Sequence, residues 1–308
     1  AAEALGISAN DVIIGSTGVI GQPLPLEPIA KGIAALAPTL SVEGHTAAAE
    51  AIMTTDTKLK EAAYTIEIGG KTVTIGAMAK GSGMIHPNMA TMLCFITTDA
   101  AIAAPMLQKA LKLAVDDTFN MVSVDGDTST NDMVSIMANG MAENEMIDSD
   151  GPAFDAFVEV IQTICRTMAK KIAGDGEGAT KLLECNVTEA KDVPLAKKIA
   201  KSIITSSLTK AAMFGADANW GRILCAIGYT EGDFSVAEVE VTISSKGGSV
   251  LVCEHGAGVP FSEEIAKQVL LEDEIHIDVN MHEGTAKATA WGCDLTYDYV
   301  KINGDYRT

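Results

Sequence analysis

The order of apolar and polar residues along this 308-residue chain switches repeatedly between helical and strand-like spacing. Helical spacing predicts helices over residues 26–36, 46–53, 105–115, 153–172, 193–206 and 262–271. Period-two alternation or short apolar runs predict strands at 11–14, 64–68, 72–75, 91–96, 121–124, 133–136, 182–187, 222–229, 238–243, 274–280 and 286–290. Helices interspersed with such strands predict an α/β fold of packed layers.

The stretch from residue 76 to residue 100 joins two unlike halves. Its first half is rich in glycine, is predicted to be irregular, and carries Lys80 and His86. Its second half is an almost continuous apolar run from Thr91, typical of a strand buried on both faces. If the bond between Ala90 and Thr91 were cut, Thr91 would carry a hydroxyl group and a free α-amine, a known way to activate a weak nucleophile. Considered alone, Thr91 is more simply explained as a β-branched residue that begins a strand.

The charge balance narrows the range of partners. The chain has 22 basic and 41 acidic residues, which gives a net charge of −19. Such an acidic surface repels nucleic acid and anionic lipid, so we expect neither as a partner. An anionic small-molecule substrate is not excluded, because a local pocket can oppose the negative field of the whole protein.

Export and disulfide formation are not indicated. No apolar run reaches the roughly 18 residues that span a bilayer, and no basic-then-apolar leader is visible. The six cysteines form no CxxC pair and lie mostly in apolar runs, which predicts reduced core thiols in a soluble, cytoplasmic protein. The chain opens with Ala-Ala-Glu-Ala and no initiator methionine, so we expect a fragment or a processed product.

Common cofactor signatures are missing from the sequence. Residues 15–21 do not match the dinucleotide fingerprint, and neither GxxxxGK[ST] nor GxSxG occurs. His276 and His282 lie in strand-like contexts and share no helix with an acidic residue, which argues against zinc. We therefore expect no metal and no nucleotide cofactor.

Four loops carry more polar residues and glycines than packing requires. Residues 16–18 follow a predicted strand and could form an oxyanion cradle or an ordinary turn. Glu177 lies among glycines in 174–178, at a ligand site or a plain helix C-terminus. The acids of 125–132 could bind a cation or be solvated, and the loop 215–221 is ambiguous.

Two groups could tune the nucleophile. A cation such as Lys80 near Thr91 would lower the pKa of the α-amine and hold a substrate carboxylate. An ordinary α-amine titrates at about 7.7–8.0, so it needs little tuning to act as a base. The alternatives are that Lys80 is a solvated loop lysine and that His86 is the base, although Pro87 beside it suggests a turn residue.

Seven motifs in order along the chain resemble one known family. They are GSTGVIG (15–21), MTTDT (53–57), MAKGSGMIHPNMATML (78–93), GDGEGATK (174–181), GADANWGR (215–222), AWGCDLT (290–296) and YVKINGDYRT (299–308). Together they closely resemble the ornithine acetyltransferase (glutamate N-acetyltransferase) family of arginine biosynthesis. The resemblance covers nearly all of the chain.

The resemblance implies a self-processing acetyltransferase. The precursor would cut itself between Ala90 and Thr91 into an α fragment, 1–90, and a β fragment, 91–308. The implied fold is a layered α/β sandwich of the N-terminal-nucleophile type, assembled as a heterotetramer of two α and two β fragments. Family precursors carry a further segment before residue 11, so we expect this chain to be a piece of a longer one.

The resemblance also implies roles for particular residues. Thr91 matches the nucleophile, and Thr17 and Gly18 match the oxyanion hole. The substrates would be N-acetylornithine, glutamate and ornithine, with no cofactor, and acetyl-CoA stays open as a second acetyl donor. The substrate-binding positions would be Thr57, Lys80, Thr91, Glu177, Asn303 and Thr308.

Two other functions stay open from the residues alone. A self-processing amidase or aminopeptidase can share the same threonine chemistry and sandwich architecture. A non-catalytic fragment that only folds or associates is the alternative from a different class.

Overall fold

The computed structural model describes residues 1–86 and 92–305, which form two β-sheets with helices packed on them. The strands are β1 (Lys60–Ile68), β2 (Lys71–Lys80), β3 (Leu93–Thr98), β4 (Val122–Ser123), β5 (Met133–Ala138), β6 (Leu182–Ala190), β7 (Glu240–Ser245), β8 (Gly248–Glu254), β9 (Ala257–Gly258), β10 (Glu274–Asn280) and β11 (Ala286–Cys293). The helices are α1 (Ala2–Leu5), α2 (Leu26–Leu36), α3 (His45–Ala51), α4 (Ala104–Asp116), α5 (Pro152–Ala173), α6 (Val193–Thr205), α7 (Ser207–Phe214), α8 (Trp220–Gly228), α9 (Glu263–Leu270) and α10 (Tyr297–Asp305).

The first sheet has the strand order β1-β2-β3-β5. β1 and β2 form the predicted hairpin, whose turn residues Gly69 and Gly70 have φ values of 60° and 77°, as a tight primed turn requires. β3 pairs antiparallel with β2 and parallel with β5. The pair Lys80–Leu93 ends the β2–β3 ladder, so the end of β2 lies beside the beginning of β3.

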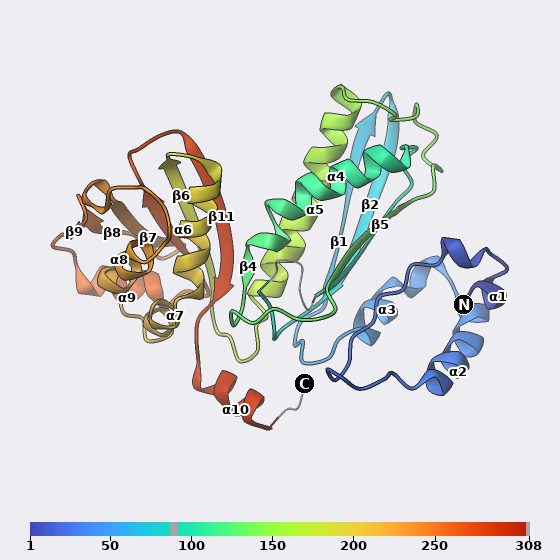
Figure 1. Cartoon of the computed structure of the whole chain (residues 1–308), viewed down its shortest axis with the longest axis horizontal. Coiled ribbons are helices and arrows are strands. Elements are labelled where there is room, and N and C mark those ends of the chain that lie inside the picture. The colour runs from blue at the N-terminus through green and yellow to red at the C-terminus, as the bar shows by residue number, and fades with distance from the viewer. Residues whose placement is uncertain (87–91, 306–308) are drawn as a thin grey trace.

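The second sheet has the order β4-β11-β6-β10-β7-β8-β9 and forms the other lobe of the molecule (Figure 1). The long helix α5 packs on β1 and β2 and also contacts β4 and β11, so it lies between the two sheets. α6 covers β6 and β11. The predicted α/β layering is thereby confirmed.

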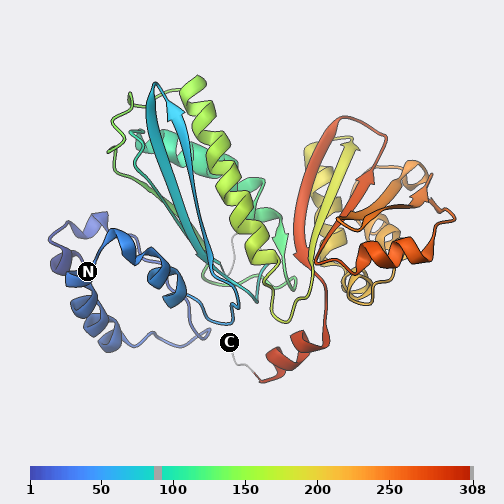
Figure 2. The same cartoon turned by 180° about the vertical axis from the view of Figure 1, so that it is seen from behind.

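The N-terminal and C-terminal segments approach one another below the two lobes. After β11 the chain leaves the second sheet and forms α10, which runs toward the N-terminal segment (Figure 2). No residue before Ala49 is buried, and α2 has no buried residue. The predicted strand at 11–14 is wrong, because these residues pair with no strand of the described chain and Ile14 is 78% exposed.

The prediction of a strand at 222–229 is also wrong, since this run belongs to helix α8. The Asn219 side chain caps the helix by accepting a hydrogen bond from the Arg222 amide at 3.2 Å. Ile223, Ala226 and Ile227 recur at helical spacing and are buried. A short apolar run does not distinguish a strand from a buried helix, and here the cap and the packing decide.

The first half of the stretch 76–100 is likewise more regular than predicted. Residues 76–80 continue β2, and irregular chain begins only at Gly81. The predicted strand 121–124 shortens to the two residues of β4, while β8, α7 and α10 were not predicted.

Among residues 1–86 and 92–305, no helix is long and apolar enough to cross a membrane. All six cysteines are free, and Cys225 is the exposed one among them.

Candidate active site

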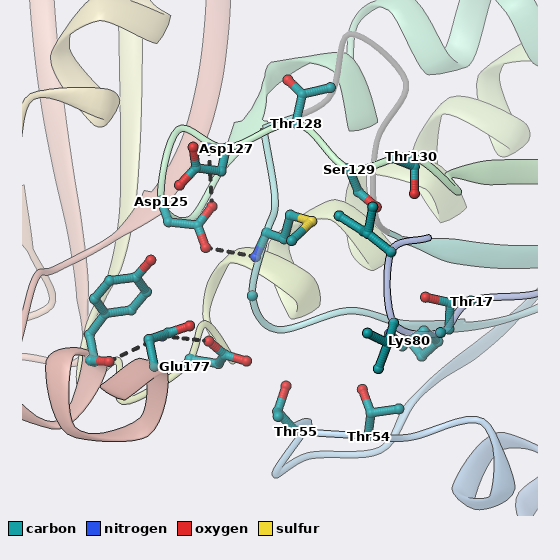
Figure 3. A pocket seen from close by; sticks show the side chains of 17 residues that line it. Thr17, Thr54, Thr55, Lys80, Asp125, Asp127, Thr128, Ser129, Thr130 and Glu177 are labelled. Atoms are coloured by element: carbon teal, nitrogen blue, oxygen red, sulfur yellow. Dashed lines mark hydrogen bonds between the residues drawn. The ribbon is translucent and has the colours of Figure 1, made fainter. Parts of the chain in front are cut away.

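A cavity of about 470 Å³ lies where the first sheet, the N-terminal segment and α10 meet. A volume of this size suits a small metabolite. Figure 3 shows Thr17 and Lys80 on one side of the cavity and Glu177 on another. Its lining includes Thr17–Ile20, Thr54, Thr55, Lys80, Gly83, Met84, Asp125, Asp127–Thr130, Glu177, Tyr299 and Asn303.

Lys80 is a buried cation at the end of β2. Lys80 is only 5% exposed, so the alternative that it is a solvated loop lysine is wrong. Burial lowers the pKa of Lys80, and the field of Lys60 adds to this, whereas Asp56, Asp132 and Glu177 act to raise it. A buried ammonium group in a cavity is well suited to bind a substrate carboxylate.

Glu177 supplies the opposite charge in the cavity. It is 8% exposed, and its Oε2 atom accepts a hydrogen bond from Asn303 Nδ2 at 2.8 Å. The Glu177 amide donates to the Ser82 carbonyl oxygen at 2.9 Å, which attaches the turn after α5 to the chain after β2. A Cβ atom at Gly83 would lie 2.3 Å from the Glu177 carboxylate, so only glycine leaves room for this arrangement.

Thr17 and Gly18 lie in irregular chain of the N-terminal segment and line the cavity. The prediction that they form an oxyanion hole remains a prediction, but both face the same space as Lys80 and Glu177. A hydroxyl group and a backbone N–H are suitable donors to a developing oxyanion.

Thr57 lies outside the lining and takes part in a buried network behind the cavity. Its amide donates to Asp175 Oδ2 at 3.0 Å, and its hydroxyl group donates to Asp175 Oδ1. Lys60 Nζ lies 2.5 Å from Asp175 Oδ2 and 2.7 Å from Asp56 Oδ1, with all three side chains at most 2% exposed. Substrate binding by Thr57 stays a prediction, whereas Thr54 and Thr55 line the cavity and were not predicted.

The polar loop 125–132 binds protein backbone. Asp125 accepts hydrogen bonds from the amides of Met84 at 2.7 Å and Ile85 at 2.9 Å. Asp132 Oδ1 accepts a hydrogen bond from the Met92 amide. Neither of the two interpretations of this loop from sequence, a cation site or solvated acids, anticipated this role.

His86 makes a hydrogen bond of 3.0 Å between Nδ1 and Ser123 Oγ. Burial lowers the pKa of His86, and Lys201 adds to this, while Asp127 opposes it. His86 is absent from the lining of the cavity, although its neighbour Met84 lines it. The role of rival base stays untested.

Three predicted site residues, Ala90, Thr91 and Thr308, lie outside the described residues. The nearest described position to Thr91 is Met92, whose carbonyl oxygen accepts a hydrogen bond of 2.9 Å from the Met133 amide. The chain after Thr91 is thus attached to β5 as well as to Asp132.

His276 has acidic neighbours that its strand context did not predict. One donor atom each from Glu184, Glu274 and His276 lie within 4.8 Å of one another. Lys170 Nζ already lies 3.1 Å from Glu184 and 2.5 Å from Glu274, so an ammonium group balances these carboxylates.

Comparison with known proteins assigns the family. The model of the ArgJ family matches residues 1–308. The arginine biosynthesis bifunctional protein ArgJ of Caldanaerobacter subterraneus subsp. tengcongensis is 54% identical over 307 residues, 100% of this chain and 76% of the relative. The protein of the same name from Bacillus subtilis is 53% identical over 307 residues, 100% of this chain and 74% of the relative.

A solved structure agrees with these relatives. The crystal structure of the arginine biosynthesis bifunctional protein argJ from Bacillus halodurans is 47% identical and superimposes with a TM-score of 0.66. The match covers 69% of this chain and 98% of that chain. The chain therefore belongs to the ArgJ family, the ornithine acetyltransferases and glutamate N-acetyltransferases of arginine biosynthesis.

Proposed function

We propose that the protein moves an acetyl group from N-acetylornithine to glutamate through an acetyl group carried on Thr91. The single observation that carries this proposal is the cavity beside the β2–β3 junction, which holds a buried cation, Lys80, and a buried carboxylate, Glu177. Both substrates are amino acids with a carboxylate, and the ornithine part of N-acetylornithine also carries an ammonium group.

Self-cleavage would prepare the nucleophile. The Thr91 hydroxyl oxygen attacks the Ala90 carbonyl carbon, and the peptide C–N bond breaks, which frees the Thr91 α-amine and leaves an ester. Water then hydrolyses this ester, which releases the Ala90 carboxylate and restores the Thr91 hydroxyl group. The crystal chain from Bacillus halodurans supports this division, because 69% of this chain covers 98% of it. Such a length agrees with the β fragment, 91–308, better than with the whole chain.

The transfer then takes place in two halves. The α-amine accepts the Thr91 hydroxyl proton while the oxygen attacks the acetyl carbon, and Thr17 and the Gly18 N–H stabilise the oxyanion by about 3–4 kcal/mol. Ornithine leaves with the proton. The glutamate amine then attacks the acetyl-threonine ester and gives up a proton to the α-amine, the ester C–O bond breaks, and N-acetylglutamate leaves as the α-amine returns the proton to the Thr91 oxygen. The α-amine serves as base in both halves, so we propose that the reaction uses no metal and no organic cofactor.

The charged groups of the cavity would orient both substrates. Lys80 binds the α-carboxylate, and Glu177 binds the ammonium group of the ornithine side chain. Asn303 from α10 would complete the binding site beside Glu177, with Thr57 acting through Asp175. Thr308 is a further proposed substrate-binding residue. These two binding roles follow from the opposite charges of Lys80 and Glu177.

The two fragments would remain together after cleavage. The α fragment contributes β1 and β2, and residues 75–80 of β2 pair with β3 of the β fragment. The Lys60–Asp175 ion pair joins the same two fragments in the interior. We propose that two such pairs form a heterotetramer and that the enzyme acts in the cytoplasm, where the five buried thiols stay reduced.

A direct assay tests the proposed reaction. Purified protein mixed with N-acetylornithine and glutamate is expected to yield N-acetylglutamate and ornithine in equal amounts, measured by liquid chromatography and mass spectrometry. Free acetate without N-acetylglutamate would identify a hydrolase instead.

The relatives are named bifunctional, so we propose that acetyl-CoA is a second acetyl donor. An assay of glutamate with acetyl-CoA as the only acetyl donor tests this proposal.

Replacing Glu177 with glutamine is expected to weaken binding of N-acetylornithine. The variant loses a charged hydrogen bond worth about 1.5–3 kcal/mol, so KM for N-acetylornithine rises roughly 10- to 150-fold. KM for glutamate, which has no side-chain ammonium group, changes little. Steady-state kinetics with each substrate varied in turn measure both values.

The matched control for E177Q is E254Q, which removes an exposed carboxylate on β8, remote from the cavity lining. E254Q is expected to keep wild-type values for both substrates. An equal rise of both KM values in E177Q would show that Glu177 does not recognise the ornithine ammonium group.

A further inference from the structure

A second cavity, of about 300 Å³, lies between helix α4 and the beginnings of strands β3 and β5. Among the described residues it shares no lining residue with the 470 Å³ cavity. Its walls are largely apolar and include Leu111, Val115 and Phe119. The exposed residues Lys112 and Asp116 of α4 also line it, so a ligand has access from the surface of this helix.

The volume of the second cavity suits a ligand with a ring-sized apolar body. A cavity of about 150 Å³ lined by leucine, isoleucine and phenylalanine binds benzene. The second cavity has similar walls and about 300 Å³ of space, so it admits a benzene ring together with a short substituent. Removal of the apolar surface of such a ligand from water favours its binding.

Two residues at the polar side of this cavity have unused hydrogen-bond acceptors. Asp132 Oδ2 and Asn120 Oδ1 are buried and have no hydrogen-bond partner among the described residues. The other polar atom of each side chain is already bound, since Asp132 Oδ1 accepts from the Met92 amide and Asn120 Nδ2 donates to Asp116 Oδ1 at 3.2 Å. Buried polar atoms nearly always have a partner, because leaving one unpaired is costly. The missing partner of both oxygens is a hydrogen-bond donor.

The charges that line the second cavity favour a cationic donor. Asp116 and Asp132 contribute two carboxylates, whereas Lys112 contributes one ammonium group. The lining residues from 119–121, from β5 and from the chain directly before β3 carry no charge. An ammonium group has three N–H donors and a charge opposite to that of a carboxylate, so it can satisfy both unused oxygens.

We infer that the second cavity binds a small protonated amine with an apolar body, whose ammonium group donates hydrogen bonds to Asp132 Oδ2 and Asn120 Oδ1. This site is separate from the cavity that holds Lys80 and Glu177, and the inference does not depend on the proposed function. The loop 125–132 connects the two cavities, because Asp132 lines the second one and residues 127–130 line the larger one. A bound amine therefore contacts a loop that shapes the larger cavity.

Binding of the amine is expected to depend on pH through Asp132. Burial raises the pKa of Asp132 to about 7, although the Met92 amide and Lys80 both act to lower it. An alkylammonium group stays charged well above pH 8, as the ordinary lysine pKa of about 10.4 indicates. Only the ionised carboxylate attracts this cation, so the dissociation constant is expected to fall about tenfold between pH 6 and pH 8. The other charged groups that line the cavity are Lys112 and Asp116.

Benzylamine is the probe, and isothermal titration calorimetry with the full chain measures its binding. Benzyl alcohol has the same shape without the charge, and benzoate has the opposite charge. At pH 8 we expect benzylamine to bind at least about tenfold more tightly than benzyl alcohol, with benzoate the weakest of the three. Equal affinities for benzylamine and benzyl alcohol would show that the cavity does not recognise a cation and would overturn the inference.

Three variants locate the bound amine. D132N is expected to raise the dissociation constant of benzylamine at pH 8 by about tenfold or more and to remove its pH dependence. The matched control is D99N, which removes a carboxylate that accepts the Thr74 amide at 2.7 Å on the first sheet, and it is expected to bind as wild type. E177Q is also expected to bind as wild type. If E177Q weakens binding and D132N does not, the amine occupies the larger cavity and the inference is wrong.

A variant that fills the second cavity carries the test if D132N does not fold. V115F keeps both unused oxygens and places a phenyl ring in the space that the ligand body would occupy. It is expected to keep the wild-type circular dichroism spectrum and to lose benzylamine binding. Wild-type affinity for benzylamine in V115F would overturn the inference.

Discussion

Replacing Thr91 with alanine is expected to leave the chain uncut and to abolish acetyl transfer. The variant has no hydroxyl group to attack the Ala90 carbonyl carbon and none to carry the acetyl group. Loss of a catalytic nucleophile lowers kcat by on the order of 10⁶-fold in a well-studied hydrolase, and we expect a loss of that order here. A denaturing gel, intact mass and the N-acetylglutamate assay measure the two effects.

Two further variants separate cleavage from transfer. T91S keeps a hydroxyl group and is expected to cleave itself and to retain measurable transfer. T97A removes an exposed threonine hydroxyl from the same strand, β3, and is expected to behave as wild type. If T91A still yields two fragments divided after residue 90, the assignment of the nucleophile is wrong.

Replacing Lys60 with methionine is expected to destabilise the folded protein by about 3–5 kcal/mol. Lys60 is 1% exposed and pairs with two buried carboxylates, Asp56 at 2.7 Å and Asp175 at 2.5 Å. Removing the ammonium group leaves both carboxylates buried without their cation. Although burial raises the pKa of Asp56, the Lys60 hydrogen bond and the Gly81 amide outweigh it and lower the pKa.

Urea unfolding at neutral pH measures this effect, and K191M is the matched control. Lys191 is 53% exposed and pairs with the exposed Asp233 at 2.6 Å, so its replacement is expected to leave stability unchanged. A triple variant, K60M with D56N and D175N, is expected to recover part of the loss because no buried charge remains. Equal stability of K60M and K191M would show that the buried network contributes little.

The buried ion pairs of Lys60 with Asp56 and Asp175 also connect the stability of the fold to the cavity that Glu177 lines. Asp175 accepts hydrogen bonds from the Thr57 and Lys58 amides and lies two residues before Glu177. The Ser82 hydroxyl group donates to the Asp175 carbonyl oxygen at 2.6 Å. The turn that carries Glu177 is therefore held to the chain around Thr57 and Ser82 at several points, and we expect K60M to impair substrate binding as well as folding.

Local patterns along the chain were sufficient for most helices and for the hairpin. The predicted helix 153–172 is α5, in which Phe157, Ile161 and Ile164 of the predicted apolar face are buried. The turn at Gly69 and Gly70 has the predicted geometry. The strand 274–280 is β10, with the same bounds. These elements are determined by periodicity and turn chemistry within one short segment.

The two wrong strand predictions concern segments whose local sequence pattern fits more than one structure. The run 222–229 is apolar enough for a buried strand, and only the Asn219 cap and the packing of Ile223 make it a helix. The segment 11–14 has a strand composition but no partner strand in the described chain. A strand needs a neighbour to satisfy its backbone hydrogen bonds, and sequence periodicity alone does not supply one.

By itself, the sequence determined which chemistry this protein has available. The motifs around Ala90–Thr91, Lys80 and Glu177 indicated the family and the nucleophile, because residue types and their order are properties of the chain. The tertiary structure alone decided that Lys80 is buried, that Lys60 pairs with Asp175 115 positions away, and that Asp132 holds the amide after Thr91. Burial, the field of neighbouring charges and hydrogen bonds between distant residues exist only after the chain has folded, so no local pattern contains them.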